Sequence, residues 1–259
     1  MSLGEVGRRS QASPCFATNA LHSMTSFIES GFTTRAEWLA AGGGTKGTID
    51  CLHMTYLPIA GRGELCRLIA AAGGLTLTED PALPEGESKA EYFSPSGVPL
   101  LKHGSLKMSQ SLAIEAYLIN ISPKFSGLTA QQKAVDGMYC GIKEEMLLNC
   151  AKAIFTTKKS APEQAKVDVT NLLDKWLALF EANLPRTGFV HGLDYPTAAD
   201  CAVLNVTTGY MPYGAAMKFA GYDSSLAKFP KVKAHADRTA AALGPAFPTK
   251  FTHANPFGM

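Results

Sequence analysis

The spacing of apolar residues along the chain changes near residue 123, and the two halves predict different structures. From Ile49 the apolar positions follow the order strand, helix, strand, with Gly73-Gly74 closing the helix. Two further apolar runs flank a Lys-His-Gly-Ser turn, as in a β-hairpin, and another helix follows. The predicted elements are a strand ending at Tyr56, a helix over 63–72, a strand over 75–78, a hairpin over 98–108 and a helix over 112–119.

Beyond Pro123 and Gly127 the apolar residues keep a helical period of about 3.6. Only the brief run Phe189-Val190-His191 has a strand-like pattern. The predicted helical segments are 129–156, 162–184, 197–210 and 227–243. The chain is therefore expected to be α+β, with a mixed first half and a helical second half.

Residues 1–49 differ in composition from the rest, since they are rich in Ser, Thr and Ala and end in a glycine-rich linker over 42–47. The basic, hydroxyl-rich start is compatible with an organelle transit peptide, but three glutamates depart from the acid-poor composition of such peptides. A disordered extension, or an upstream reading frame ahead of a start at Met24 or Met54, are the alternatives. Within this segment Thr34 and Glu37 predict a capping box for a short helix.

Composition limits the classes of function. With 259 residues, 46% hydrophobic and 18% charged, the chain is typical of a globular protein, and a formal charge of +2 does not favour nucleic acid as a partner. No apolar run reaches the roughly 20 residues that cross a bilayer. The six cysteines have neither CxxC nor paired Cys/His spacing, so disulfides and a metal site are not expected. Such cysteines fit a reducing compartment, and we expect a cytoplasmic protein, or an organellar one if residues 1–49 are a transit peptide.

Tyr56 is the first candidate for chemistry because it lies where the first predicted strand ends. In open α/β sheets, ligands bind beyond the carboxyl ends of the strands. A lone tyrosine there would ordinarily be an edge aromatic with its ring in the core and its hydroxyl in water. Here a Gly-Arg-Gly turn at 61–63 follows, and Arg62 would raise the positive potential beside the hydroxyl.

Two further motifs have both a structural and a functional interpretation. Val98-Pro99 precedes the hairpin, where a proline can simply open a strand. Gln110-Ser111 opens a helix, where a serine is usually an N-cap. The N-terminus of a helix also binds anions, because its free N–H groups and its positive dipole end point outward.

Two other pairs are expected to be structural. Thr197 and Asp200 lie three residues apart at the start of a predicted helix, and they resemble a capping box. Glu64 and Arg67 lie three residues apart on the first predicted helix, and we expect them to form a solvated pair.

Four motifs occur in an order that resembles the tyrosine-type glutathione transferases, especially the sigma-like ones, over about residues 50–245. They are the Tyr56 stretch with its Gly-Arg-Gly turn, Val98-Pro99, the Gln110-Ser111 run and the Thr-x-x-Asp box. This resemblance implies a thioredoxin-like N-terminal domain followed by an all-helical C-terminal domain. The implied division is an extension over 1–49, a glutathione-binding domain over 50–123, a helical domain over 129–245 and a tail over 246–259.

The resemblance also implies which residues contact glutathione. The Val98-Pro99 bond would be cis, so that the backbone N–H and C=O of Val98 pair with the cysteinyl backbone as an added strand would. Gln110 and Ser111 would hold the γ-glutamyl carboxylate and amine. Sigma-like enzymes place a Trp and a Lys near the glycyl carboxylate; this chain has no Trp there, and Lys89 is the nearest match.

The catalytic residues implied by the resemblance are Tyr56 and Arg62. Tyr56 would donate its hydroxyl hydrogen to the glutathione sulfur, and the charge of Arg62 would assist in holding a thiolate. A homodimer is also implied, in which Asp136 would reach across the interface toward the γ-glutamyl amine. Asp136 as a solvated acid on a helix face is the alternative, since the acids that sigma-like enzymes place further along this helix are not matched at Cys140.

The function implied is conjugation of the glutathione thiolate to small hydrophobic electrophiles, with glutathione as co-substrate, in detoxification. The electrophile would lie against the helical half, near Tyr139, Cys140, Met146 and Tyr210. One alternative is glutathione-dependent isomerisation or peroxide reduction, as in prostaglandin D isomerases. Another is a non-catalytic relative, such as a lens crystallin or a carrier of hydrophobic ligands.

Overall fold

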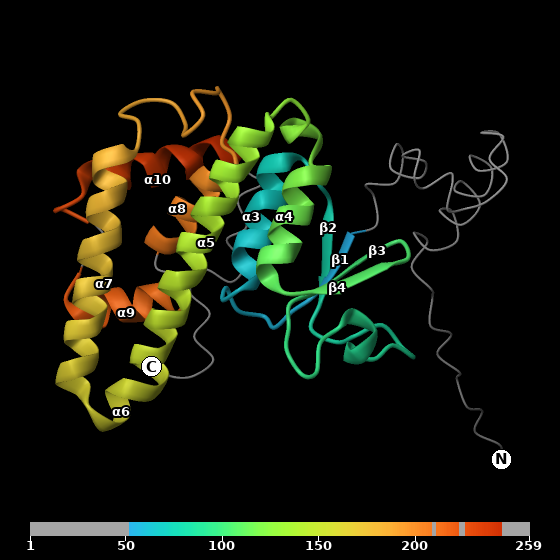
Figure 1. Ribbon diagram of the computed structural model, residues 1–259, viewed down its shortest axis with the longest axis horizontal. Coiled ribbons are helices and arrows are strands. Elements are labelled where there is room, and N and C mark those ends of the chain that lie inside the picture. The colour runs from blue at the N-terminus through green and yellow to red at the C-terminus, as the bar shows by residue number, and fades with distance from the viewer. Residues whose placement is uncertain (1–51, 209–210, 223–225, 245–259) are drawn as a thin grey trace, which may run out of the picture.

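The computed structural model describes residues 52–208, 211–222 and 226–244, and its first part is a mixed four-stranded sheet (Figure 1). The strand order is β2-β1-β3-β4. β1 is parallel to β2 and antiparallel to β3, and β3 and β4 form the expected hairpin. The strands are Leu52–Thr55 (β1), Leu77–Asp80 (β2), Leu100–His103 (β3) and Leu106–Ser109 (β4).

Two helices, α3 (Gly63–Gly73) and α4 (Ser111–Ile121), lie together between the sheet and the helical half (Figure 1). α3 ends at Gly74, whose φ of 76° is the left-handed conformation that glycine adopts readily. The next N–H, that of Leu75, bonds the carbonyl of Ala70 at 2.8 Å. Because the Leu75 N–H bonds the last turn of the helix, β2 begins two residues later than the pattern predicted.

The second half is helical, as predicted. A 3-10 helix, η3 (Pro123–Phe125), connects the two halves, and a short one, η2 (Lys89–Tyr92), precedes β3. The helices are α5 (Ala130–Lys152), the π-helix η4 (Ala153–Thr157), α6 (Lys158–Ser160), α7 (Pro162–Asn183), α8 (Ala198–Thr207), α9 (Tyr213–Ala220) and α10 (Pro230–Leu243). α9 was not predicted, and the strand-like run at 189–191 is a turn closed by the Gly192 N–H on the Phe189 carbonyl at 2.8 Å.

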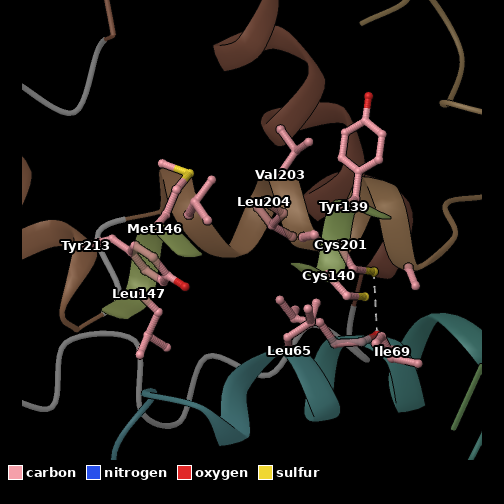
Figure 2. Close-up of a cluster of buried hydrophobic side chains, with 14 of the residues drawn as sticks. Leu65, Ile69, Tyr139, Cys140, Met146, Leu147, Cys201, Val203, Leu204 and Tyr213 are labelled. Atoms are coloured by element: carbon pink, nitrogen blue, oxygen red, sulfur yellow. Dashed lines mark hydrogen bonds between the residues drawn. The ribbon is translucent and has the colours of Figure 1, made fainter. Parts of the chain in front are cut away.

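The core between the two halves is mostly apolar. Figure 2 shows Leu65 and Ile69 of α3 facing Cys140 of α5 and Cys201 of α8, and the Cys201 thiol lies 3.7 Å from the Leu68 carbonyl. All ten residues of α8 are buried, which places this helix at the centre of the helical half.

Three residues expected to line an electrophile site belong to this core instead. Tyr139, Cys140 and Met146 are 7%, 3% and 0% exposed (Figure 2). Their shared face of α5 is directed inward, and the Tyr139 ring stacks on Phe180 with centroids 5.6 Å apart. The fourth expected residue, Tyr210, lies outside the described residues, as do the N-terminal extension with its Thr34 capping box and the tail at 246–259.

The capping box at the start of α8 is confirmed. The Asp200 carboxylate accepts hydrogen bonds from the Thr197 N–H at 2.8 Å and the Val190 N–H at 2.9 Å. Asp200 and Thr197 are fully buried. The carboxylate thereby ties the loop before α8 to the helix N-terminus, which is the structural role expected of it.

Candidate functional site

The side chain of Tyr56 lies at the end of β1 beneath the turn that leads into α3. Its N–H continues the sheet by bonding the Asp80 carbonyl at 3.2 Å, which fixes the residue at the strand end. The hydroxyl oxygen accepts a hydrogen bond from the backbone N–H of Arg62 at 2.8 Å, and the residue is 7% exposed. The hydroxyl hydrogen has no acceptor among the described residues, so it is available to a ligand.

The two glycines of the turn let the backbone approach the tyrosine. A Cβ on Gly63 would lie 2.4 Å from Cδ1 of Tyr56, and a Cβ on Gly61 would lie 2.3 Å from its hydroxyl oxygen. Gly61 also has a φ of 44°, a region that side chains disfavour. Gly61 and Gly63 are therefore required by the contact between this turn and Tyr56.

The helical half helps to hold the same turn in place. The Gly61 N–H bonds the carbonyl of Met211, in the segment before α9, at 3.2 Å. The Arg62 side chain reaches Glu144 of α5 with an Nε–Oε1 distance of 2.8 Å. Both halves of the fold consequently set the position of the Tyr56 hydroxyl.

The environment keeps Tyr56 protonated. Burial raises the pKa of its phenol above the ordinary value, while the N–H groups of Arg62 and Gly63 and the charges of Arg67 and Arg62 act in the opposite direction. A phenol in this state donates a hydrogen bond at neutral pH and does not act as a base.

Arg67 is not the solvated residue that the sequence predicted. Its side chain is 4% exposed, and it forms ion pairs with Glu64 at 2.7 Å and with Glu79 of β2 at 2.8 Å. Its guanidinium carbon lies 5.6 Å from the centroid of the Tyr56 ring. Burial acts to lower the pKa of Arg67, but the two carboxylates outweigh it and raise the pKa. The charge of Arg67 therefore remains beside Tyr56 at all ordinary pH values.

A pocket of about 560 Å³ lies beside this turn. It is formed by the turn, the loop before β3, the end of β4, the N-terminus of α4 and one residue of α5. The lining residues are Arg62, Ser94, Gly97, Val98, Pro99, Ser109, Gln110, Ser111, Leu112, Ala113 and Glu144. Five of the residues that the sequence predicted for the site are thus brought together on one pocket.

The loop before β3 presents free backbone groups to this pocket. The Val98-Pro99 bond is cis, as the resemblance implied. Neither the N–H nor the C=O of Val98 has a hydrogen-bond partner within the described part of the chain. These two groups can pair with an extended ligand in the manner of an added strand.

The N-terminus of α4 also supplies hydrogen-bond donors to the pocket. Gln110 precedes the helix with a φ of 73°, and no side chain caps the helix. The first N–H that bonds within α4 is that of Ile114, to the Gln110 carbonyl, so the N–H groups of Ser111, Leu112 and Ala113 are left for a ligand. This end of the pocket is suited to a carboxylate.

Tyr56, Lys89 and Asp136 are not among the residues that line the pocket, although Tyr56 is bonded to the lining residue Arg62. Lys89 bonds the Ser96 carbonyl through Nζ at 2.6 Å. Asp136 is 0% exposed and accepts from the Thr197 hydroxyl at 2.8 Å and the Ala199 N–H at 2.9 Å. The prediction that Asp136 reaches a partner subunit does not fit this position, because its carboxylate is enclosed by the start of α8.

Sequence reasoning missed a group of charges behind the pocket. Glu144 pairs with Arg62 and lies 3.3 Å from Lys143, and Lys143 pairs with Glu115 of α4 at 2.6 Å. One signal was available: Glu115 is a charged residue inside the apolar run of the helix at 112–119. Its partner on α5 could not be found from spacing.

The protein's own thiols do not supply a nucleophile within the described residues. Cys66, Cys140, Cys150 and Cys201 are free and buried. Burial raises the pKa of each, to about 12 for Cys150, so these thiols stay protonated. Among the described residues, no group of three or more His, Cys, Asp or Glu side chains could hold a metal ion. No helix in the described ranges has the length and apolar character to span a membrane.

A small mixed sheet covered by two helices and followed by an all-helical half is the fold of the glutathione transferases. The fold implied by the sequence resemblance is confirmed. No protein-family model matches the chain, and a search of curated proteins finds no match.

Solved structures of other proteins do match the fold of this chain. The structure of NaGST-2 has a TM-score of 0.58 at 22% identity, and the match covers 76% of this chain and 93% of that one. Rat hPGDS complexed with a quinoline has a TM-score of 0.54 at 19% identity, covering 76% and 93%. The Pi-class glutathione S-transferase of Onchocerca volvulus has a TM-score of 0.56 at 17% identity, covering 76% and 89%.

Proposed function

We propose that this protein binds glutathione in the pocket of about 560 Å³ and transfers its thiolate to small hydrophobic electrophiles. The observation that carries the proposal is the Tyr56 hydroxyl, which accepts from the Arg62 N–H and has its own hydrogen unused among the described residues. Tyr56 itself is not among the residues that line the pocket, and its link to the pocket is this hydrogen bond from Arg62, which does line it.

The residues of the pocket fit a tripeptide with this chemistry. The free N–H and C=O of Val98 suit the backbone of the central cysteinyl residue. The three free N–H groups at the start of α4, with Gln110 and Ser111, suit the γ-glutamyl carboxylate. Lys89, whose ammonium bonds the Ser96 carbonyl, and Asp136, whose carboxylate is enclosed at the start of α8, are left out of the proposed site.

The proposed chemical role of Tyr56 is to favour the thiolate. A free thiol has a pKa of about 8.5, and lowering it by about two units requires roughly 2.7 kcal/mol of preferential stabilisation of the anion. A hydrogen bond from a neutral phenol to a thiolate is charge-assisted and contributes to this. Tyr56 can donate it because its pKa is raised and the phenol stays protonated. The Arg62 N–H polarises the same hydroxyl, and the charges of Arg62 and Arg67 favour an anion nearby.

We also propose a homodimer and the domain division of 50–123 and 129–245. Support for self-association comes from large apolar side chains at the surface, such as Phe93 at 88% and Met138 at 54% exposed. Sedimentation velocity on the purified chain measures the oligomeric state directly.

The decisive test replaces Tyr56 by Phe. The variant keeps the ring and loses only the hydroxyl, so we expect it to bind glutathione in calorimetry and to lose most conjugating activity with chlorodinitrobenzene. It should also lose the ultraviolet absorbance of bound thiolate at neutral pH. Full conjugating activity in Tyr56→Phe would remove the proposed mechanism.

A second candidate is glutathione-dependent isomerisation. It is favoured by the fold likeness to rat hPGDS, a prostaglandin D synthase, at 19% identity. The same thiolate would serve this reaction and peroxide reduction. Product analysis with a prostaglandin endoperoxide, beside the chlorodinitrobenzene assay, separates them. Glutathione binding without turnover on any of these substrates would instead indicate a carrier or a crystallin-like relative.

A further inference from the structure

Four charged side chains form a continuous line from the core to the pocket. Glu115 of α4 contacts Lys143 of α5 at 2.6 Å, Lys143 contacts Glu144 at 3.3 Å, and Glu144 contacts Arg62 at 2.8 Å. The signs alternate, so each contact is attractive. We call this set the charge line.

The inner end of the charge line is buried and its outer end reaches solvent. The side chains of Glu115 and Lys143 are 0% and 1% exposed, that of Glu144 is 14% exposed and that of Arg62 is 38% exposed. An exposed ion pair between Arg62 and a single carboxylate would hold the guanidinium only weakly, because solvent screens the pair and the long side chain loses rotamer entropy. A carboxylate that is itself anchored by a buried ammonium is a firmer support.

Glu144 is anchored through both of its oxygens. Oε1 accepts from Arg62 and Oε2 contacts the Lys143 ammonium. Lys143 in turn lies on a rigid part of the fold, since its backbone carbonyl accepts from the buried Tyr213 hydroxyl of α9 at 3.0 Å. The orientation of Arg62 at the pocket therefore depends on a residue that does not touch the pocket.

The groups that face Lys143 come from several elements. Besides Glu115 and Glu144, the thiols of Cys66 on α3 and Cys140 on α5 act on this pair. Burial acts to lower the pKa of Lys143, but the two glutamates outweigh it and raise the pKa, so the ammonium stays charged. Burial raises the pKa of Glu115 to about 7, against the effect of Lys143.

We propose that Lys143 is a positioning residue for the glutathione site: through Glu144 it holds the Arg62 guanidinium where its charge favours a thiolate beside Tyr56. This inference rests on the proposed function. It assigns a role to a buried pair that the apolar packing of α4 on α5 does not require.

The test removes the inner pair without changing the net charge. Lys143→Met alone would leave Glu115 buried beside no cation and could fail to fold, so the informative variant is Glu115→Gln with Lys143→Met. The matched control is Glu87→Gln with Lys102→Met, which removes another ion pair, with side chains 13% and 16% exposed and outside the pocket lining. Melting temperatures establish that both double variants fold.

The readouts are the pH dependence of kcat/KM and the thiolate absorbance of bound glutathione. We expect the Glu115/Lys143 variant to lose about threefold in kcat/KM at about pH 7 and to recover at alkaline pH, which corresponds to a thiol pKa raised by about one unit, from about 6.5 to about 7.5. The control should keep the wild-type profile. Glu144→Gln should give the same shift, and adding it to the double variant should change nothing more, since all act through one contact.

The outcomes separate this inference from the proposed function. If Tyr56→Phe abolishes the thiolate absorbance while the folded Glu115/Lys143 variant keeps the wild-type profile, the positioning role is overturned and the proposed function stands. If Glu144→Gln and the double variant have additive effects, the line is not a single unit and the role is likewise overturned. If wild-type protein gives no thiolate with glutathione, both are overturned.

Discussion

The guanidinium carbon of Arg67 lies 5.6 Å from the centroid of the Tyr56 ring, and the same guanidinium pairs with Glu64 and Glu79. One buried cation thus links the first turn of α3, strand β2 and the candidate catalytic tyrosine. We expect Arg67→Met to lower the free energy of unfolding by about 3–5 kcal/mol, because it leaves the fully buried Glu64 carboxylate beside an apolar group. Urea denaturation measures this. Arg67→Lys, which keeps the charge, should lose less, and equal losses would show that packing rather than charge is responsible.

Gly63 is predicted to tolerate no side chain. An alanine Cβ would lie 2.4 Å from Tyr56 Cδ1, so the ring must move away from its position under the turn. Because small displacements of a reacting group are costly, we expect Gly63→Ala to lose about a hundredfold in kcat/KM. Gly137→Ala on α5 is the control, since its Cβ would meet nothing within 4 Å, and it should keep full activity. Wild-type activity in Gly63→Ala would contradict the required contact.

Ser111 is predicted to contribute to glutathione affinity. It lies on the pocket wall at the first position of α4, and it is 6% exposed. Ser111→Ala removes one hydrogen bond to a charged group, for which we expect about tenfold weaker binding by calorimetry. Ser126→Ala, at an exposed position outside the pocket, should bind as wild type does. Equal affinities for the two variants would place the γ-glutamyl group elsewhere.

Glu87 is predicted to make stability depend on pH in acid. Partial burial acts to raise its pKa, but hydrogen bonds from Lys102, Tyr92 and Lys107 outweigh it and lower the pKa to about 2 from the ordinary 4.5. A carboxyl with a depressed pKa in the folded state stabilises the protein above the unfolded pKa, and this is lost as pH falls from about 4.5 toward 2. The free energy of unfolding, measured by urea denaturation at several pH values in this range, should fall more steeply with decreasing pH for wild type than for Glu87→Gln. The exposed neighbour Glu85→Gln should leave the dependence unchanged.

Asp136 is predicted to affect stability and not self-association. Its Oδ1 accepts from Thr197, Ala199 and His191, and we expect Asp136→Asn to cost about 1–3 kcal/mol in unfolding free energy. Asp237→Asn, whose side chain is 63% exposed, is the matched change and should stay within about 0.5 kcal/mol. A sedimentation coefficient that changes only in Asp136→Asn would restore Asp136 as an interface residue.

The sequence by itself determined the local elements of this protein and the residues of its site that act close to the strand and helix ends. Alternation and helical period predicted β1, the hairpin, α3, α4 and a helical second half, because these patterns depend on neighbours a few residues apart. The Tyr56 stretch, Val98-Pro99 and Gln110-Ser111 were found for the same reason: turn and cap chemistry is local.

Only the tertiary structure decided which side chains meet across elements. Glu115 and Lys143 are 28 residues apart, and nothing in their spacing shows that α4 and α5 bring them within 2.6 Å. The sequence predicts a solvated Arg67, and an Asp136 that either reaches a partner subunit or lies in solvent, because charged residues usually lie at the surface. In the folded protein both side chains are buried. Burial is a property of the whole fold, and the cost of burying a charge is met only when distant partners are in place.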